Sequence, residues 1–337
     1  MKIVLFDTHD FERPYFDQAN QRFAYELTYL PPILEASTAP LSKGYDCVCS
    51  FVNDHLDAPT LEILKENGIR LIALRSAGFN HVDLGAAAKL DLPVVRVPEY
   101  SPYAVAEHAL ALILTLNRKI HRASQRIREL NFSLNGLVGF DLYGSTVGIV
   151  GTGKIGRVLV RIMHGLGCRV LIHDLIEDQR LIEQYQVEYV TLPELYRRSD
   201  IISLHVPLTP ETYHMIDAQA LAQMKDGVYI INTGRGALID SAALLEGLKT
   251  RKIGGAGLDV YEEEEGVFFQ DLSDRFLEDD VLARLLSFPN VIVTSHQAFL
   301  TRQALTNIAE TTLQNISDFA SQKPLRNQVR SPSKIDK

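Results

Sequence analysis

The chain has 337 residues, of which 46% are hydrophobic and 23% charged, and its formal net charge is −8 at pH 7. Single hydrophobic cores rarely grow beyond about 250–300 residues, so this length predicts two domains. The acidic balance argues against a nucleic-acid partner, because no basic excess exists to neutralise phosphates. No apolar stretch approaches the roughly 20 residues of a membrane span, so no membrane partner is expected either.

The N-terminus and the cysteines indicate the compartment. The chain opens on a strand-like run, Lys2–Phe6, without the basic and apolar regions of a signal peptide. The three cysteines form no disulfide framework and accompany no metal-ligand cluster. Cys47 and Cys49 lie in an apolar run in which a strand turns both to one face, so we expect buried thiols. The sequence predicts a cytoplasmic protein that binds no metal.

Strand-like and helix-like runs alternate over the first hundred residues. The four predicted strands are Ile3–Phe6, Cys47–Val52, Leu71–Arg75 and Val94–Val97. Helical patterns intervene at Leu61–Glu66 and Leu84–Leu90. This alternation favours a parallel sheet covered by helices.

A long helical pattern follows. Ser101 is a suitable N-cap, Pro102 suits the first helical position, and no later proline interrupts the run to about Leu130. The first half is nearly all apolar, whereas the second half, Asn117–Glu129, is strongly basic. The sequence therefore predicts one helix that bridges two domains and emerges at a surface or a subunit contact.

A second α/β run begins near Thr146. Its six predicted strands are Val147–Val150, Val170–His173, Ile201–His205, Tyr229–Asn232, Gly257–Val260 and Val291–Ser295. Six strands suffice for a doubly wound sheet, and we expect the last helix, Arg302–Phe319, to return to the first domain.

The predicted fold is thus α/β, with two Rossmann-like, doubly wound parallel-sheet domains, the first of them discontinuous. The first domain comprises residues 1–100 and 299–330, and the second comprises residues 101–298. Residues 331–337 are expected to form a flexible tail.

A glycine-rich turn follows the first strand of the second domain. Gly151, Gly153 and Gly156 have the G-x-G-x-x-G spacing and precede an amphipathic helical pattern, Arg157–Leu166. The first glycine permits a tight turn, the second lets the backbone approach a pyrophosphate, and the third allows close helix packing. The free N–H groups of the helix N-terminus favour an anion. Together these features predict dinucleotide binding.

Asp174 ends the next strand, 18 residues past the last glycine. A carboxylate near this spacing accepts hydrogen bonds from the adenosine ribose and repels a 2′-phosphate, and the following Leu175 and Ile176 supply no compensating arginine. The alternative is that Asp174 only caps a turn. The sequence favours NAD over NADP.

The later motifs resemble one family over nearly the whole chain. The motifs are Phe51–Asn53, Leu74–Asp83, Val105–His108, Ser203–Thr212, Met224–Gly227, Ile231–Gly236, Gly257–Tyr261 and His296–Thr301. They are similar to those of the D-2-hydroxyacid dehydrogenases, and most strongly to the bacterial D-lactate branch. The resemblance implies a first domain that binds substrate, an NAD-binding second domain, and reversible reduction of pyruvate to D-lactate.

The resemblance implies three catalytic residues, each with suitable chemistry. Arg235, in a glycine-flanked turn, can hold a substrate carboxylate with its planar fork. His296, after the last predicted strand, can donate a proton to the carbonyl oxygen. Glu264 would orient that histidine. It lies in the acidic run Glu262–Glu265, which by default is a solvated turn.

The resemblance also implies binding residues. Ala77 and Gly78 would present N–H groups to the substrate carboxylate, and the rings of Phe51, Tyr100 and Phe299 would favour a methyl-sized group. Ordinary core packing is the alternative for these rings. On the cofactor side the implied residues, besides the glycines and Asp174, are Lys154, Ile155, Val206, Pro207, Thr212, Thr233, Gly234 and Asp259. His205 matches a strand motif and has no catalytic position.

Two alternatives to pyruvate reduction remain open. One is a dehydrogenase for a larger 2-keto acid, such as phenylpyruvate or 2-ketoisocaproate. The other is a binding protein similar to NAD-sensing transcriptional corepressors. The expected partners are a small 2-keto or 2-hydroxy acid and a second copy of the chain. A homodimer, or a dimer of dimers, would form through the basic half of the long helix and the segment Asn131–Tyr143.

Overall fold

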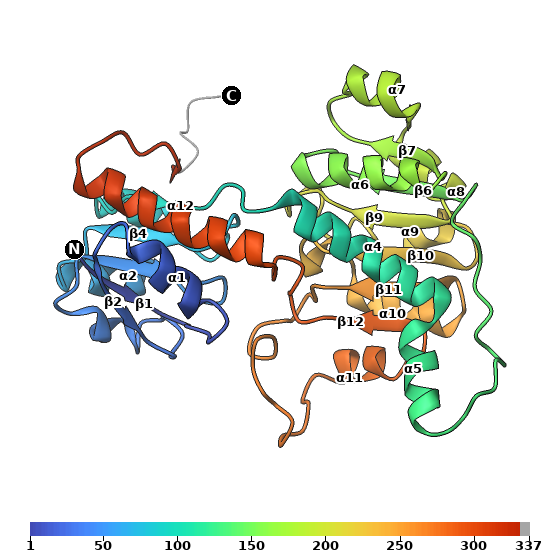
Figure 1. Ribbon diagram of the computed structural model, residues 1–337, viewed down its shortest axis with the longest axis horizontal. Coiled ribbons are helices and arrows are strands. Elements are labelled where there is room, and N and C mark those ends of the chain that lie inside the picture. Colours follow the sequence, from blue (N-terminus) through green and yellow to red (C-terminus); the bar gives the residue numbers. More distant parts are fainter. Residues whose placement is uncertain (331–337) are drawn as a thin grey trace. The chain divides into compact units, whose positions relative to one another are not determined.

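The computed structural model describes residues 1–330 and divides the chain into two α/β units (Figure 1). The first unit is Met1–Ser101 together with the chain from Phe299 onward, and the second is Pro102–Ala298. The prediction of two parallel-sheet units, the first discontinuous, is confirmed. The predicted flexible tail, residues 331–337, lies outside the described residues.

The first unit contains a six-stranded sheet in the order β13-β5-β4-β3-β1-β2. In chain order its strands are β1 (Lys2–Leu5), β2 (Glu26–Tyr29), β3 (Cys47–Ser50), β4 (Leu71–Leu74), β5 (Val94–Val95) and β13 (Gln328–Val329). All neighbours pair in parallel except β13, which is antiparallel to β5. The two strands that the sequence did not predict, β2 and β13, contain no fully buried residue, so an apolar pattern did not mark them.

Helices cover both faces of this sheet. Its helical elements are α1 (Arg13–Asn20), η1 (Ala39–Ser42), α2 (Ala58–Glu66), α3 (Leu84–Lys89) and α12 (Arg302–Ala320). Val4 and Phe6 pack in one cluster with α2 and α3, whereas Ile3 and Leu5 face α1 and α12. The last helix packs on α1 and β4, which brings the C-terminal segment into the first unit (Figure 1). The cysteines of β3 are buried free thiols, as predicted.

The second unit contains a seven-stranded parallel sheet in the order β12-β11-β10-β9-β6-β7-β8. Its strands are β6 (Thr146–Val150), β7 (Arg169–His173), β8 (Glu188–Tyr189), β9 (Ile201–Leu204), β10 (Val228–Asn232), β11 (Ile253–Leu258) and β12 (Val291–Val293). Six of them correspond to the predicted strands, with ends that differ by a few residues, and the two-residue edge strand β8 is additional.

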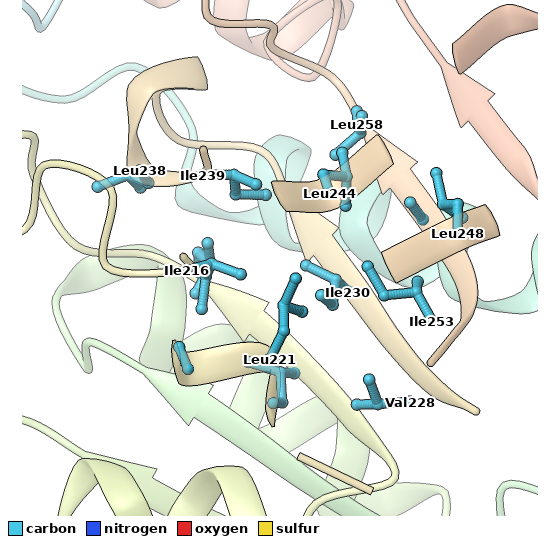
Figure 2. Packing of buried hydrophobic residues seen from close by; sticks show 14 of the residues in the cluster. Ile216, Leu221, Val228, Ile230, Leu238, Ile239, Leu244, Leu248, Ile253 and Leu258 are labelled. Atoms are coloured by element: carbon cyan, nitrogen blue, oxygen red, sulfur yellow. The ribbon is translucent and has the colours of Figure 1, made fainter. Parts of the chain in front are cut away.

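Successive residues of this sheet face opposite layers, as the period of a strand requires. Ile230 of β10 packs under α9 (Ala218–Gln223) and α10 (Ser241–Lys249), in the cluster that Figure 2 shows. Ile231 faces the other layer, with α4 (Pro102–Arg118) and α6 (Lys154–Gly165). The remaining helical elements are α5 (Ile120–Arg128), α7 (Gln179–Tyr185), α8 (Leu192–Arg198), η2 (Gly236–Leu238) and α11 (Asp280–Leu286).

The prediction of one continuous helix from Ser101 to about Leu130 is wrong. The helix breaks at Lys119, whose φ of 51° is left-handed, and α5 continues after it. The side chain of Asn117 exchanges two hydrogen bonds with the backbone of Phe140, at 2.7 and 2.8 Å. A distant segment thus engages the last turn of α4. Among the described residues, no helix combines the length and apolarity needed to cross a membrane.

Candidate active site

The predicted site residues of the second unit gather at one edge of its sheet. The chain leaves β6 toward β7 on one side and later returns to pair β9 on the other. Such a switch point opens a crevice at the carboxyl ends of the strands. Gly151, Asp174, His205, Thr233 and Asp259 each directly follow one of five adjacent strands.

The tight turn predicted at Gly151 and the close packing predicted at Gly156 are present in the glycine loop. Gly151 has φ of +92°, and a Cβ there would lie 2.8 Å from the carbonyl oxygen of His205. A Cβ on Gly156 would lie 2.0 Å from the carbonyl oxygen of Gly151, so only glycine lets α6 pack this closely. Gly153 faces open space and caps α6 without a side-chain hydrogen bond. An anion can therefore approach the N–H groups of this helix.

Asp174 lies beside the glycine loop. Its carboxylate accepts from the N–H of Thr152 at 2.6 Å and from the Thr152 hydroxyl at 2.7 Å, and it also accepts from the N–H of Ile176. Burial alone would raise the pKa of Asp174, but these bonds hold it below its ordinary value. The group is thus a carboxylate at neutral pH, which is the charge that its predicted role requires.

The other predicted cofactor residues lie along the same edge. Lys154 and Ile155 form the first turn of α6, and Val206, Pro207 and Thr212 lie in the loop after β9. In the turn after β10, the buried hydroxyl of Thr233 has no hydrogen-bond partner among the described residues, whereas Gly234 is held by Asn232. An unpartnered buried hydroxyl and an uncapped helix N-terminus both fit a dinucleotide.

His296 and Glu264 form a hydrogen-bonded pair. Nδ1 of His296 lies 2.9 Å from Oε1 of Glu264, and both side chains are about one-fifth exposed. Oε2 of Glu264 accepts from the N–H of Tyr261 at 3.1 Å, which fixes the carboxylate. Because Nδ1 is engaged, Nε2 is the nitrogen from which a proton can be passed on.

The backbone at His296 is strained. Its φ of 50° is left-handed, which is uncommon for a residue with a side chain. The N–H of His296 donates to the carbonyl of Asp259 at 2.7 Å, and the Asp259 carboxylate accepts from the N–H groups of Gln297 and Ala298. Strain of this kind persists where the surroundings over-determine it, and it gathers at functional sites.

Arg235 occupies the glycine-flanked turn after β10. A Cβ on Gly236 would lie 2.0 Å from the carbonyl group of Tyr261, so glycine lets this turn pack against the segment that leads to Glu264. Nη1 of Arg235 donates to the carbonyl of Gly234 at 2.7 Å. Among the described residues Arg235 forms no ion pair, so its guanidinium can donate to the carboxylate of a ligand.

The acidic run is not a uniformly solvated turn. Glu262 is partly buried, binds the imidazole of His214, and accepts from the hydroxyl of Ser241 at 2.9 Å. The interpretation of Glu262 as a solvated charge is therefore wrong, because the fold uses it to join three segments. Glu263 is exposed, as expected for such a run.

His205 differs from His296 in its chemistry. Its Nε2 lies 2.8 Å from the hydroxyl of Ser203, and desolvation lowers its pKa to about 4. A neutral, hydrogen-bonded imidazole is a poor proton donor at neutral pH. This agrees with the assignment of His205 to a structural motif.

In the first unit, the predicted aromatic residues meet around Phe299. The ring centroid of Phe51 lies 6.5 Å from that of Phe299, and the ring centroid of Tyr100 lies 6.3 Å from it; both contacts are edge-on. Sequence reasoning missed two further members of this cluster, His9 and Phe11, whose rings stack at 5.3 Å. Both follow β1 at the carboxyl edge, and that position is the signal that could have found them.

Ala77 and Gly78 form the loop after β4. Arg96 donates to the carbonyl of Ala77, and the hydroxyl of Ser76 donates to the carbonyl of Gly78, both at 2.7 Å. Their own N–H groups donate to no other described residue. Two free N–H groups in one turn are suited to an anion.

A buried ion pair that the sequence did not predict supports this loop. Nε of Arg75 lies 2.9 Å from a carboxylate oxygen of Glu12, and both side chains are almost fully buried. The guanidinium also donates to the carbonyls of Phe6, Asp7 and Cys49. Arg75 therefore links the carboxyl ends of β1, β3 and β4, and the Ala77–Gly78 loop follows the last of these strands.

The dinucleotide-binding turn, Asp174 and the His296–Glu264 pair define an NAD-dependent dehydrogenase with acid–base chemistry. The family model for the D-isomer specific 2-hydroxyacid dehydrogenase, NAD binding domain, matches residues 110–298. The D-lactate dehydrogenase of Escherichia coli strain K12 is 51% identical over 329 residues, which cover 98% of this chain and 100% of that protein. The chain belongs to the D-isomer specific 2-hydroxyacid dehydrogenases.

Solved structures agree with this family. The apo structure of the Escherichia coli D-lactate dehydrogenase has a TM-score of 0.90 at 50% identity, covering 98% of this chain and 100% of that one. A structure for the pyruvate reductase of Chlamydomonas reinhardtii has a TM-score of 0.91 at 44% identity, covering 97% and 98%. The predictions of the family, of an NAD-dependent dehydrogenase acting on small 2-hydroxy acids, and of NAD as cofactor are confirmed.

Replacing Asp174 with Ala should narrow the preference for NADH over NADPH. The change removes a charge that repels the 2′-phosphate, and it also releases Thr152, so NADH binding weakens. We expect the ratio of the two kcat/KM values to fall by roughly tenfold, equivalent to about 1.4 kcal/mol. Glu177→Ala, at an exposed position three residues on, is the control and should leave the ratio unchanged. A wild type that uses both cofactors equally would contradict the role of Asp174.

Replacing Glu264 with Gln should lower kcat for pyruvate reduction. The mutation removes the carboxylate oxygen that lies 2.9 Å from Nδ1 of His296 and holds the ring. A proton donor that is less well oriented reacts more slowly, so kcat should fall by about 10–100-fold while the dissociation constant of NADH stays unchanged by fluorescence titration.

The exposed Glu263 is the matched control for Glu264. Glu263→Gln alters only a screened charge and should leave kcat unchanged. Glu262→Gln is unsuitable as a control because it breaks the contacts with His214 and Ser241. Equal losses of kcat in the Glu263 and Glu264 variants would indicate that Glu264 is not a specific partner of His296.

Proposed function

We propose that the protein is a D-lactate dehydrogenase that reversibly reduces pyruvate with NADH. The observation that carries the proposal is the His296–Glu264 pair, held on a strained backbone at the edge that binds the cofactor. The similarity to the Escherichia coli D-lactate dehydrogenase over its whole length supports pyruvate as the substrate. The D stereochemistry of the product is inferred from the D-isomer specific family to which the chain belongs.

In the proposed reaction each side chain has one task. NADH, when bound, supplies the hydride. The guanidinium of Arg235 binds the substrate carboxylate and orients the keto group, and the N–H groups of Ala77 and Gly78 are further donors to that carboxylate. His296 donates its Nε2 proton to the carbonyl oxygen, while Glu264 orients the ring and stabilises its charged form. In the reverse direction the neutral imidazole accepts the hydroxyl proton of D-lactate.

The residues of the cofactor edge divide the binding of NAD among them. The helix N-terminus after Gly153, with Lys154 and Ile155, would receive the pyrophosphate, and Asp174 the adenosine ribose. The loop residues Val206, Pro207 and Thr212 and the turn residues Thr233 and Gly234 would line the rest of the cofactor. Asp259 belongs to this set by position, although its side chain is fully buried.

The aromatic cluster is proposed to set substrate size. Phe51, Tyr100 and Phe299 crowd one region of the first unit, which we propose is the substrate-binding unit, residues 1–100 and 299–330. Rigid rings leave little room beyond a methyl group, and one misfitting methylene costs about 1–3 kcal/mol of discrimination. Pyruvate is therefore preferred over phenylpyruvate or 2-ketoisocaproate.

A panel of 2-keto acids tests the function. Initial rates with NADH should be highest for pyruvate, and the product should be D-lactate by chiral chromatography. A higher kcat/KM with phenylpyruvate or 2-ketoisocaproate would replace pyruvate with a larger substrate. Protein that binds NADH and consumes none with any acid would indicate a corepressor-like binding protein.

We propose that the protein is a cytoplasmic homodimer or dimer of dimers. Seven large apolar side chains of the segment 120–143 are at least half exposed, namely Ile120, Ile127, Leu130, Phe132, Leu134, Val138 and Tyr143. Large apolar side chains left exposed along one segment favour a contact with another subunit. Sedimentation at micromolar concentration should show a dimer or a tetramer, and the double change Leu134→Asp with Val138→Asp should yield monomer. A wild-type monomer would remove the assembly from the proposal.

A further inference from the structure

His108 lies on α4, in the Val105–His108 motif, to which the sequence assigned no role. Its side chain is 17% exposed, and its Nε2 faces two oxygens near the site. The distance from Nε2 to the hydroxyl oxygen of Thr294 is 3.0 Å, and that to Oδ1 of Asp259 is 3.3 Å. Thr294 and Asp259 lie on the two segments that hold His296.

The direction of these hydrogen bonds follows from the number of protons. The Thr294 hydroxyl has one proton and lies 2.6 Å from Oδ1 of Asp259, a carboxylate oxygen that can only accept. That proton therefore points to Asp259, and the Thr294 oxygen can only accept from His108. The Nε2 of His108 must carry a proton, so His108 is a donor to this cluster.

Asp259 accepts hydrogen bonds from His296 and from the two residues that follow it. The carboxylate of Asp259 accepts from the N–H of Gln297 at 2.9 Å and from the N–H of Ala298 at 2.8 Å. The backbone carbonyl of Asp259 accepts from the N–H of His296 at 2.7 Å. The Asp259 side chain is fully buried, and a buried carboxylate is costly unless donors surround it. His108 and Thr294 are two of these donors.

We propose that His108 is a positioning residue that holds the imidazole of His296 in place through Thr294 and Asp259. The proposal rests on the proposed role of His296 as proton donor. The link is mechanical: His108 fixes the Asp259 carboxylate, Asp259 holds the backbone N–H groups of residues 296–298, and the left-handed φ of His296 is kept. A displacement of about 1 Å at a reacting group can cost about 100-fold in rate.

Two substitutions at His108 separate donation from packing. His108→Leu removes the donor and keeps an apolar side chain of similar bulk, whereas His108→Gln retains an N–H at a similar reach. We expect the Leu variant to lower kcat for pyruvate reduction by about 10–100-fold and to leave the dissociation constant of NADH unchanged by fluorescence titration. The Gln variant should restore most of kcat. His164→Leu, at an exposed histidine of α6, is the control and should behave as wild type.

A double-mutant cycle shows whether His108 acts through His296. If it does, His108→Leu should cause little further loss of kcat when His296 is already Gln, because the imidazole it positions is absent. The deuterium isotope effect on hydride transfer should also rise in the Leu variant, since chemistry becomes slower than product release. Additive losses in the double variant would overturn the proposal, and so would a Leu variant with the wild-type kcat or a Gln variant as slow as Leu.

The same set of enzymes separates this inference from the proposed function. A His296→Gln enzyme with the wild-type rate would remove the proton-donor role itself. A slow His296→Gln enzyme together with a normal His108→Leu enzyme would contradict only the positioning role. Thermal unfolding of each full-length variant should show a cooperative transition above the assay temperature, and a Leu variant that loses NADH binding and kcat together would overturn the positioning role.

Discussion

Replacing His296 with Gln is expected to lower the rate of pyruvate reduction by about 10²–10⁴-fold, the usual contribution of a positioned acid. Glutamine occupies a similar volume and can still donate a hydrogen bond, but it cannot release a proton to the carbonyl oxygen. The alkoxide that develops as hydride arrives is then left without its proton. A loss of this size corresponds to about 3–5 kcal/mol of transition-state stabilisation.

NADH binding distinguishes a chemical role of His296 from a structural one. The cofactor residues lie on the glycine loop, at Asp174 and on the turn after β10, none of which is held by the His296 side chain. The dissociation constant of NADH, measured by fluorescence, should therefore barely change in the Gln variant. A large loss of cofactor affinity would mean that His296 supports the fold of the site.

Replacing Arg235 with Lys is expected to lower kcat/KM for pyruvate by about 100-fold, with KM raised and kcat lowered. Lysine keeps the positive charge but is a point charge, whereas the planar guanidinium can donate two parallel hydrogen bonds to a carboxylate. The rise in KM reflects the missing hydrogen bond, and the fall in kcat reflects a keto group that is no longer oriented toward the hydride and the proton. Steady-state kinetics over a range of pyruvate concentrations separate the two effects.

An exposed arginine of the second unit provides the control for Arg235. Arg251 lies in the same unit at an exposed position after α10, so Arg251→Lys should leave both constants unchanged. Wild-type kinetics in the Arg235→Lys enzyme would rule out the anchoring role. A variant that loses only kcat would assign Arg235 to the transition state alone.

The cofactor half of the site could be read from the sequence because its determinants are local. Gly151, Gly153 and Gly156 are close in the chain, and their spacing specifies one turn and one helix start whatever lies around them. The buried parallel strands appear as short apolar runs, so the positions that follow them, such as Asp174 and His296, could be placed at one edge. Family motifs added the roles of Arg235 and Glu264, which spacing alone left open.

Contacts between distant segments were decided only by the tertiary structure. Nothing in the sequence around Lys119 breaks a helix, yet Asn117 pairs with Phe140 and the helix ends there. In the acidic run, only packing shows that Glu264 reaches His296 while Glu262 binds His214. His108 likewise gains its meaning from Thr294, 186 residues later. Hydrogen bonds of this kind depend on where folding places two side chains, and no local pattern of residues encodes that.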